Sequence, residues 1–276
     1  MPLPVPVTMD PGSPRQGGLL ASARALPAGW ERGIAWSDDS CTLPVAMGEC
    51  PTQEGLKPPQ PLTQEVFRPV DLIQTIACTT LGGGPAGLAG PALDQTRDFA
   101  LARELLTGAA SARDANTADH ANPALVDTAT DLGTFPSLVA AVACLDQRLA
   151  AATGGRSGYL LAGLDMASYL LAADVLWREG ARWRTAGGTT VIVSAGFDGR
   201  GPGDTAPPVA GAELYLYAVS NVWAGVGART LLFDVDRTDN TATDRAEDIA
   251  LVAFSTCAVF AASSPDATSC GSDESP

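Results

Sequence analysis

The residue pattern with the clearest chemical precedent is a glycine-rich stretch, Gly82-Gly83-Gly84-Pro85-Ala86-Gly87-Leu88-Ala89-Gly90. It matches G-x-G-x-x-G, in which the glycines allow a tight turn and a following helix N-terminus holds the pyrophosphate of a dinucleotide. Here Pro91 is expected to interrupt that helix, and Glu104, near the spacing of the ribose-binding acid, falls inside a helical pattern. The stretch 82–87 is therefore interpreted as a flexible glycine loop, with a dinucleotide-binding enzyme as the less favoured alternative.

Two residue types that occur only once in the chain, histidine and lysine, are candidates for catalysis. His120 is the only histidine, and it lies in a polar stretch without a nearby serine or cysteine nucleophile signature. A Ser-His-Asp arrangement stays open because such triads are assembled in space, yet a solvated loop histidine is the favoured interpretation. Lys57 is the only lysine, so any Schiff-base or P-loop site would have to rest on it, in a loop-like context between Leu56 and Pro58.

Acidic residues gather toward the C-terminus with the flavour of a calcium loop. The cluster comprises Asp234, Asp236, Asp239, Asn240, Asp244 and Glu247. Counted from Asp234, the sixth position is Asp239 rather than glycine, and the twelfth is Arg245 rather than glutamate. A solvated turn with helix-capping carboxylates is predicted instead of a metal site.

A second acidic pair lies in an apolar segment. Asp165 and Asp174 are nine residues apart on an expected helix, which places them on opposite sides of it and excludes a paired-carboxylate site. We therefore assign no catalytic, cofactor-binding or metal-binding residues, and the chain is interpreted as a non-enzyme without a cofactor.

Six cysteines are present, and none forms a C-x-x-C pair, so zinc and thioredoxin-like sites have no support. Cys144 and Cys257 lie in apolar runs and are predicted to be buried thiols. Cys41 and Cys50 flank a short polar loop, and whether they pair in a disulfide stays open.

Composition bounds the class of protein. The chain has 276 residues, 46% of them hydrophobic, and 31 acidic against 17 basic residues give a formal net charge of -14. Such a charge favours solubility and opposes general binding to nucleic acid or anionic membranes. The N-terminus lacks the pattern of a secretory signal, and the most apolar helix candidate, 160–177, carries two carboxylates. We expect a protein made in the host cytoplasm without a membrane anchor.

The order of expected elements indicates an α+β fold without regular βαβ alternation. Helices are predicted from Pro91 to about Gly108, from Pro136 to Gly154, and over about 158–179. Strands are predicted over 66–80, 189–194, 213–219 and 222–236. A turn at Asp239-Asn240, a short helical turn over about 243–248, two short strands within 249–261 and a polar tail from 263 complete the pattern.

The segment from Gly158 to Gly180, followed by Thr185-Ala186-Gly187-Gly188 and the run Thr189 to Phe197, resembles the axial-domain passage of tailed-phage major capsid proteins and encapsulins. Leu214 to Val219 and Val222-Trp223 look like the next strands, and Arg237 to Phe260 resembles the C-terminal return in structural proteins of actinobacterial phages. The resemblance covers about residues 60–262.

This resemblance implies the Hong Kong 97-type capsid fold, with an arm and a loop that reach over neighbouring subunits. The implied ranges are an extended N-terminal arm (1–30), a loop and strand region (31–90), a long-helix and peripheral region (91–157), an axial-type region with the return strands (158–262) and a polar tail (263–276). The implied function is a virion protein that assembles with copies of itself and other virion proteins into an icosahedral shell, which encloses DNA without sequence-specific binding. Another virion component, such as a portal-proximal, tail or minor head protein, is the alternative.

Overall fold

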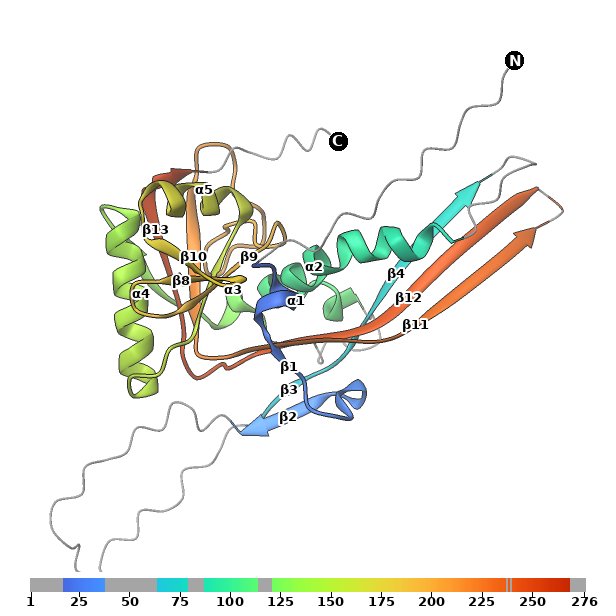
Figure 1. Ribbon diagram of the computed structural model, residues 1–276, viewed down its shortest axis with the longest axis horizontal. Coiled ribbons are helices and arrows are strands. Elements are labelled where there is room, and N and C mark those ends of the chain that lie inside the picture. Colours follow the sequence, from blue (N-terminus) through green and yellow to red (C-terminus); the bar gives the residue numbers. More distant parts are fainter. Residues whose placement is uncertain are drawn as a thin grey trace, which may run out of the picture.

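The computed structural model describes residues 17–37, 64–78, 87–113, 121–236, 238 and 240–268, and in them two large sheets of different shape are accompanied by a small two-stranded sheet. One sheet is a seven-stranded lobe with helices packed on it, and the other is drawn out into long strands that project to one side (Figure 1). We call these the seven-stranded lobe and the extended lobe. No helix of the described residues is long and apolar enough to cross a membrane.

The elements follow the chain in this order. The helices are α1 (Leu19–Ser22), η1 (Trp30–Arg32), α2 (Ala89–Thr107), η2 (Ser111–Arg113), α3 (Leu125–Thr128), α4 (Leu138–Thr153) and α5 (Leu164–Ala172). The first strands are β1 (Arg24–Ala25), β2 (Ile34–Ser37), β3 (Gln64–Phe67), β4 (Val70–Cys78), β5 (Thr130–Thr134), β6 (Tyr159–Ala162) and β7 (Leu176–Glu179). The remaining strands are β8 (Arg182–Thr185), β9 (Thr190–Val193), β10 (Glu213–Val219), β11 (Val222–Asp236), β12 (Thr241–Phe254) and β13 (Val259–Thr268).

The seven-stranded lobe has the strand order β5-β13-β10-β6-β9-β8-β7. Its central strand β6 is buried along its whole length, because alternate residues face different parts of the core. Leu160 lies in the cluster that contains α4 and α5, whereas Tyr159 and Leu161 lie in the cluster shared with α2. The core therefore continues from one lobe into the other.

The helix expected over 158–179 is wrong. That segment contains strand β6, the short helix α5 and strand β7. Leu160, Leu161 and Ala162 form a short apolar run that suits a buried strand as well as a buried helix, and pairing with β9 and β10 decides for the strand. Gly163 precedes α5, and Asp174 follows it with a left-handed φ of 53°. The two aspartates are thus not on one helix.

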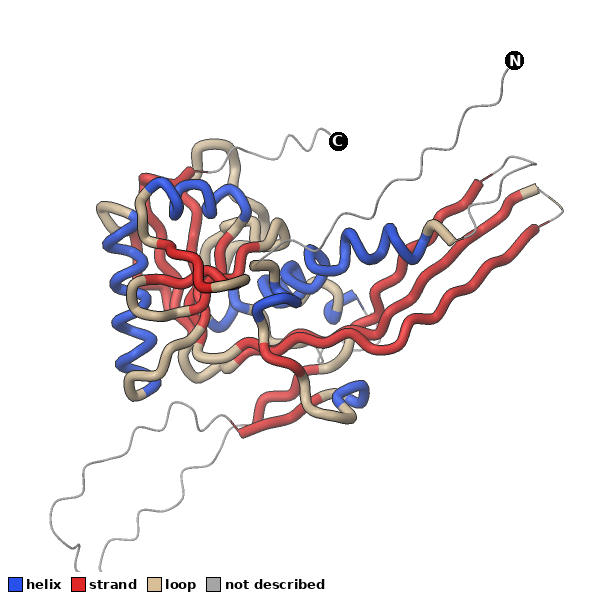
Figure 2. The backbone as a smooth tube through the Cα atoms, viewed as in Figure 1, coloured by secondary structure: helices blue, strands red, loops and turns tan. Residues whose placement is uncertain are grey.

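The extended lobe has the strand order β1-β11-β12-β4, with α2 packed on β12 and β4. Strands β11 and β12 form a long antiparallel hairpin, and Figure 2 shows them, with β4, as the red strands that project beside the blue helix α2. The helical turn expected over 243–248 is wrong, because these residues lie inside β12 and pair with β4 on one side and β11 on the other. Pairing on both sides overrides the local preference of the polar residues.

Each lobe is built from segments that belong to more than one of the expected ranges. Strands β11 and β12, which fall in 158–262, pair with β4 rather than with the seven-stranded sheet, and α4, which falls in 91–157, packs on that sheet. Residues 263–268, expected to begin a polar tail, extend β13, and Ser263 and Ser264 are buried there. Within the expected arm, Leu19 is fully buried and β1 pairs with β11.

Pro91 lies inside a helix, contrary to the expectation that it would interrupt one. Residues 82–86 lie outside the described residues, and Gly87 has a left-handed φ of 81° just before α2. Pro91 does not interrupt a helix, since α2 begins at Ala89 and Pro91 occupies its first turn. The missing N–H of a proline loses no intrahelical hydrogen bond there.

The junction between the lobes depends on a close approach of α2 to the loop after β9. Asp98 of α2 accepts hydrogen bonds from the backbone N–H of Leu20 at 2.9 Å and from the Ser194 hydroxyl at 3.1 Å. At Gly196 a Cβ atom would lie 2.8 Å from the Cβ of Ala102 and 2.8 Å from the backbone nitrogen of Arg103. Only glycine allows the loop this near to the helix.

Replacing Gly196 with alanine is therefore expected to destabilise the subunit. The added methyl group has to push α2 away from β9, so the free energy of unfolding should fall by about 1–3 kcal/mol. Urea denaturation of the unassembled subunit measures this change. The control is Gly227→Ala, whose Cβ would meet its nearest atom at 3.4 Å. Equal stability of the two variants would contradict the close-approach argument.

Candidate functional site

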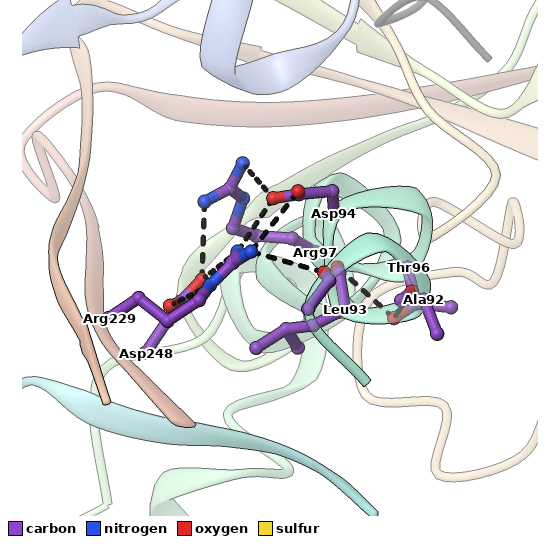
Figure 3. A network of polar contacts seen from close by, with 8 residues as sticks. Ala92, Leu93, Asp94, Thr96, Arg97, Arg229 and Asp248 are labelled. Carbon is purple, nitrogen blue, oxygen red and sulfur yellow. Dashed lines mark hydrogen bonds and ion pairs between the residues drawn. The ribbon is translucent and has the colours of Figure 1, made fainter. Parts of the chain in front are cut away.

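An ion-pair network joins α2 to the β11–β12 hairpin (Figure 3). Arg229 of β11 lies opposite Asp248 of β12 in the ladder, and its Nε and Nη2 donate to the two carboxylate oxygens of Asp248, both at 2.9 Å. The same guanidinium donates from Nη1 to the carbonyl oxygen of Gly90 at 3.1 Å and from Nη2 to Asp94 Oδ1 at 2.6 Å. One side chain of β11 therefore contacts β12 and the first turns of α2.

Arg97 closes the network from the helix side. Its Nη2 lies 2.9 Å from Asp94 Oδ1, and its Nη1 donates to Asp248 Oδ2 at 3.2 Å. Two arginines and two aspartates thus balance in charge, and Asp248, only 1% exposed, has cationic partners on both sides. The side chains bind one another, so we interpret the network as a structural clamp on the extended lobe.

The electrostatics of the clamp follow from these contacts. The hydrogen bond from Arg229 lowers the pKa of Asp94 below its usual value of 3.8. Hydrogen bonds to Asp248 and Asp94 raise the pKa of Arg229, so it stays charged throughout the accessible range. Because the folded-state pKa of Asp94 is lowered, its contribution to stability is present above pH 3.8 and is lost as the pH falls through the folded-state value.

The lowered pKa of Asp94 predicts how the stability of the subunit depends on pH. The difference in unfolding free energy between the native subunit and an Arg229→Met variant should shrink as the pH falls below 3.8. Protonation of Asp94 removes in the native protein the same attraction that the substitution removes in the variant. Urea denaturation of both proteins between about pH 6 and pH 2.5 measures the difference. A difference that stays constant over this range would contradict the assignment.

A second buried carboxylate fixes the start of α2. Asp244 of β12 accepts a hydrogen bond from the backbone N–H of Ala89 at 2.7 Å, at the first residue of the helix. A carboxylate at this position satisfies a free N–H group and interacts favourably with the helix dipole. The sequence predicts a solvated turn with helix-capping carboxylates in this cluster, but Asp244 is buried in β12 and the helix that it caps is the distant α2.

The rest of that cluster is spread over two faces of the sheet. Glu247 ion-pairs with Arg245, whereas Asp244 and Asp248 are buried on the side of α2. Asp234 and Asp236 are exposed on β11, and Asp239 lies outside the described residues. Among the residues that the structure describes, no group of three or more His, Cys, Asp or Glu side chains could hold a metal ion.

The cysteines differ from expectation where the structure describes them. Cys257 was predicted to be a buried thiol, but it is exposed and takes part in a disulfide. Cys144 is a free thiol, as predicted, but it is only half-buried because it lies on a partly exposed face of α4. An apolar run does not reveal which face of its helix or turn a given residue occupies. Cys41, Cys50, Lys57 and His120 lie outside the described residues.

The outer edge of the extended lobe carries exposed apolar side chains that the sequence analysis did not single out. Leu231, Phe233 and Val235 of β11 are 61%, 52% and 50% exposed, and their alternation places them on one face of the strand. We call these three residues the β11 stripe. In the described part of the chain, β11 pairs on its outer side only with β1, at Trp223 and Ala224.

Exposed apolar side chains on an open edge are the kind of surface that another chain covers. The apolar run Leu231-Leu232-Phe233 was visible in the sequence, but Leu232, which is 49% exposed, breaks a strict alternation of apolar and polar residues. What the sequence did not show is that β11 would be the edge strand.

Comparisons with known proteins place the fold. No family model matches the sequence, and no curated protein matches it. The capsid of an empty GTA particle superposes with a TM-score of 0.58 at 10% identity, covering 95% of both chains. A structure of Mycobacterium phage Adephagia gives 0.53 at 15% identity, covering 94% of this chain and 95% of that chain. The holo-SrpI encapsulin complex from Synechococcus elongatus gives 0.50 at 10% identity, covering 96% and 93%.

These likenesses extend over nearly the whole of each chain, at identities that report on the fold alone. They confirm the fold class expected from the sequence, an α+β chain with the Hong Kong 97-type capsid architecture.

Proposed function

From this Hong Kong 97-type fold, we propose that the chain is a self-assembling structural subunit of a phage-type capsid shell that encloses DNA. The fold likeness to a GTA particle capsid and to an encapsulin complex supports the proposal. Its partners are copies of itself and other virion proteins. The protein acts by forming contacts rather than by chemistry.

The observation that carries the proposal on this chain is the form of the extended lobe. A long hairpin projects away from the seven-stranded lobe (Figure 1). It carries the β11 stripe, and β1 pairs with β11 only at Trp223 and Ala224. A monomer that stayed alone would expose this apolar edge to water and to uncontrolled strand pairing. Burial between subunits removes both costs and accounts for the stripe.

The clamp would serve the same function by holding the hairpin rigidly. A projecting hairpin transmits a defined geometry to a neighbouring subunit only if it is held rigidly. Arg229 and Asp248 fix the hairpin strands to one another, and their contacts with Asp94 and Arg97 fix both strands to α2. The orientation of the hairpin against α2 is thus held by ion-paired residues that are distant in sequence.

The acidic charge of the chain supports a containing role toward DNA. A formal net charge of -14 lets DNA lie close to the shell wall without adhering to it. Purified shells are therefore expected to bind duplex DNA weakly at physiological salt. Tight binding that weakens steeply with salt would contradict a containing role.

Negative-stain electron microscopy of the purified full chain, combined with light scattering, tests the proposal. Closed icosahedral shells or curved fragments of one lattice would support it. Rings or tubes of small fixed number would instead indicate another kind of virion component. A particle that remains monomeric alone and also when mixed with the other head proteins of its virion would overturn the proposal.

A further inference from the structure

A cavity of about 400 Å³ lies between the N-terminal segment and the seven-stranded lobe. It is lined by residues 23–25 around the start of β1, by residues 157–159 at the start of β6, and by side chains of β8 and β9. Three arginines contribute to this lining, Arg24, Arg182 and Arg184, and no acidic residue does. In a chain with a net charge of -14, such a concentration of positive charge calls for an explanation.

The fold places the arginines together by register. Arg182 and Arg184 are two residues apart on β8, so their side chains leave the same face of the strand. Thr190 of β9 pairs with Arg184, and Tyr159 of β6 pairs with Thr190, which continues the lining across three strands. Arg24 comes from β1, which belongs to the other sheet, and completes the cavity from the opposite side.

The arginines differ in how far their charge is already neutralised. Arg184 ion-pairs with Glu179, and its Nη1 donates to the carbonyl oxygen of Gly188 at 2.8 Å. The guanidinium groups of Arg24 and Arg182 have no hydrogen-bond or ion-pair partner within the described ranges, although both backbones pair in sheets. Two guanidinium groups at one cavity thus keep their donors available, while Arg184 is held in place.

From this arrangement we infer that the cavity binds an oxyanion of the phosphate class, held by Arg24 and Arg182 with Arg184 as the fixed third side. Guanidinium groups present paired N–H donors that match the oxygens of a phosphate. Bound phosphate would also relieve the repulsion between like charges that converge on the same space.

The size and surroundings of the site favour a small group over a duplex. A volume of about 400 Å³ accommodates a phosphate or a nucleotide-sized monoester. Fields from the acidic remainder of the protein are screened beyond about 8 Å at physiological salt, so a small anion is attracted by the local arginines. A duplex would instead meet the negative surface over a much longer span. The site therefore binds a phosphate group that is free in solution or at the end of a nucleotide or strand.

The inference goes beyond shell formation and is tested on the full chain in whatever assembled state it adopts. Inorganic phosphate is titrated at constant ionic strength with chloride as the balancing anion, and binding is followed by calorimetry and by the rise in unfolding midpoint. In the Arg24→Gln, Arg182→Gln double variant, the dissociation constant for phosphate should rise by about tenfold or more. Arg148→Gln with Arg32→Gln is the matched control, since both arginines are exposed and lie away from the cavity.

Loss of phosphate binding in the cavity variant, with native binding in the control variant, would support the inference. Absence of phosphate binding by the native chain, or equal binding by both variants, would overturn it. Short single strands with and without a 5′-phosphate then identify the source, because a strand-end ligand binds only in the phosphorylated form and only with Arg24 and Arg182 present.

Discussion

Replacing Arg229 with methionine should lower the unfolding free energy of the subunit by about 3 kcal/mol. The substitution keeps the apolar stem of the side chain but leaves the carboxylate of Asp248, 1% exposed, with Arg97 as its remaining cationic partner. It also removes the hydrogen bonds from β11 to Asp94 and to the carbonyl oxygen of Gly90. Urea denaturation of unassembled subunits near neutral pH measures the loss.

The same sheet supplies the control for this prediction. Arg245 forms an ion pair with Glu247, and both side chains are partly exposed to solvent. Arg245→Met should therefore cost less than about 1 kcal/mol. Adding Asp248→Asn to Arg229→Met should recover part of the loss, because a neutral amide needs no counter-charge. Equal costs for Arg229→Met and Arg245→Met would show that the clamp is not the main support of the hairpin.

Replacing Phe233 and Val235 of the β11 stripe with glutamine should abolish or strongly impair shell assembly. Burying a phenylalanine or valine side chain contributes about 1.5–3 kcal/mol, so the concentration needed for assembly should rise by about tenfold or more. The subunit itself should fold normally, because both side chains are half-exposed in it. Light scattering across a concentration series, with electron microscopy of the products, measures the threshold.

A matched variant distinguishes this effect from a general change of surface polarity. Val209 is 74% exposed in the loop before β10, on the seven-stranded lobe. Val209→Gln should leave the assembly threshold unchanged. If the stripe variant assembles at the native concentration into shells of native size, the β11 edge is not an assembly contact.

Local pattern was sufficient for elements whose signal is contained in a few consecutive residues. The helix of Leu138–Thr153 follows from apolar spacing between Pro136 and Gly154, with Ser137 capping its start through the N–H of Ala140. Strand β10 was predicted with the bounds that the structure shows, Glu213–Val219. In these segments, hydrophobic period and chain-breaking residues agree with each other and with the tertiary contacts.

Local pattern failed where a segment suits two structures and a distant partner decides between them. Leu160-Leu161-Ala162 became a strand because β9 and β10 lie on both sides of it. Residues 243–248 became the middle of β12 because β4, more than a hundred and fifty residues away, pairs with them. In such segments the hydrogen bonds to neighbouring strands decide the structure, and these bonds depend on residues outside the segment.

The candidate site shows the same division. The acidic cluster was predicted to be a solvated turn with helix-capping carboxylates, but Asp244 is buried in a strand and caps a helix that begins at Ala89, far away in sequence. Arg229 was not recognised at all, since its partners Asp94 and Asp248 come from two distant segments, helix α2 and strand β12. A charged residue in an expected strand gives no sign of whether it faces solvent or a helix.

The sequence by itself determined the α+β class and the acidic net charge, and, through resemblance, the Hong Kong 97-type architecture. The tertiary structure decided which strand forms the edge of the extended lobe, which carboxylates are buried beneath α2, and which arginines line one cavity. The physical reason is that periodicity records whether a residue is buried, whereas strand order and ion pairing depend on which distant segment buries it.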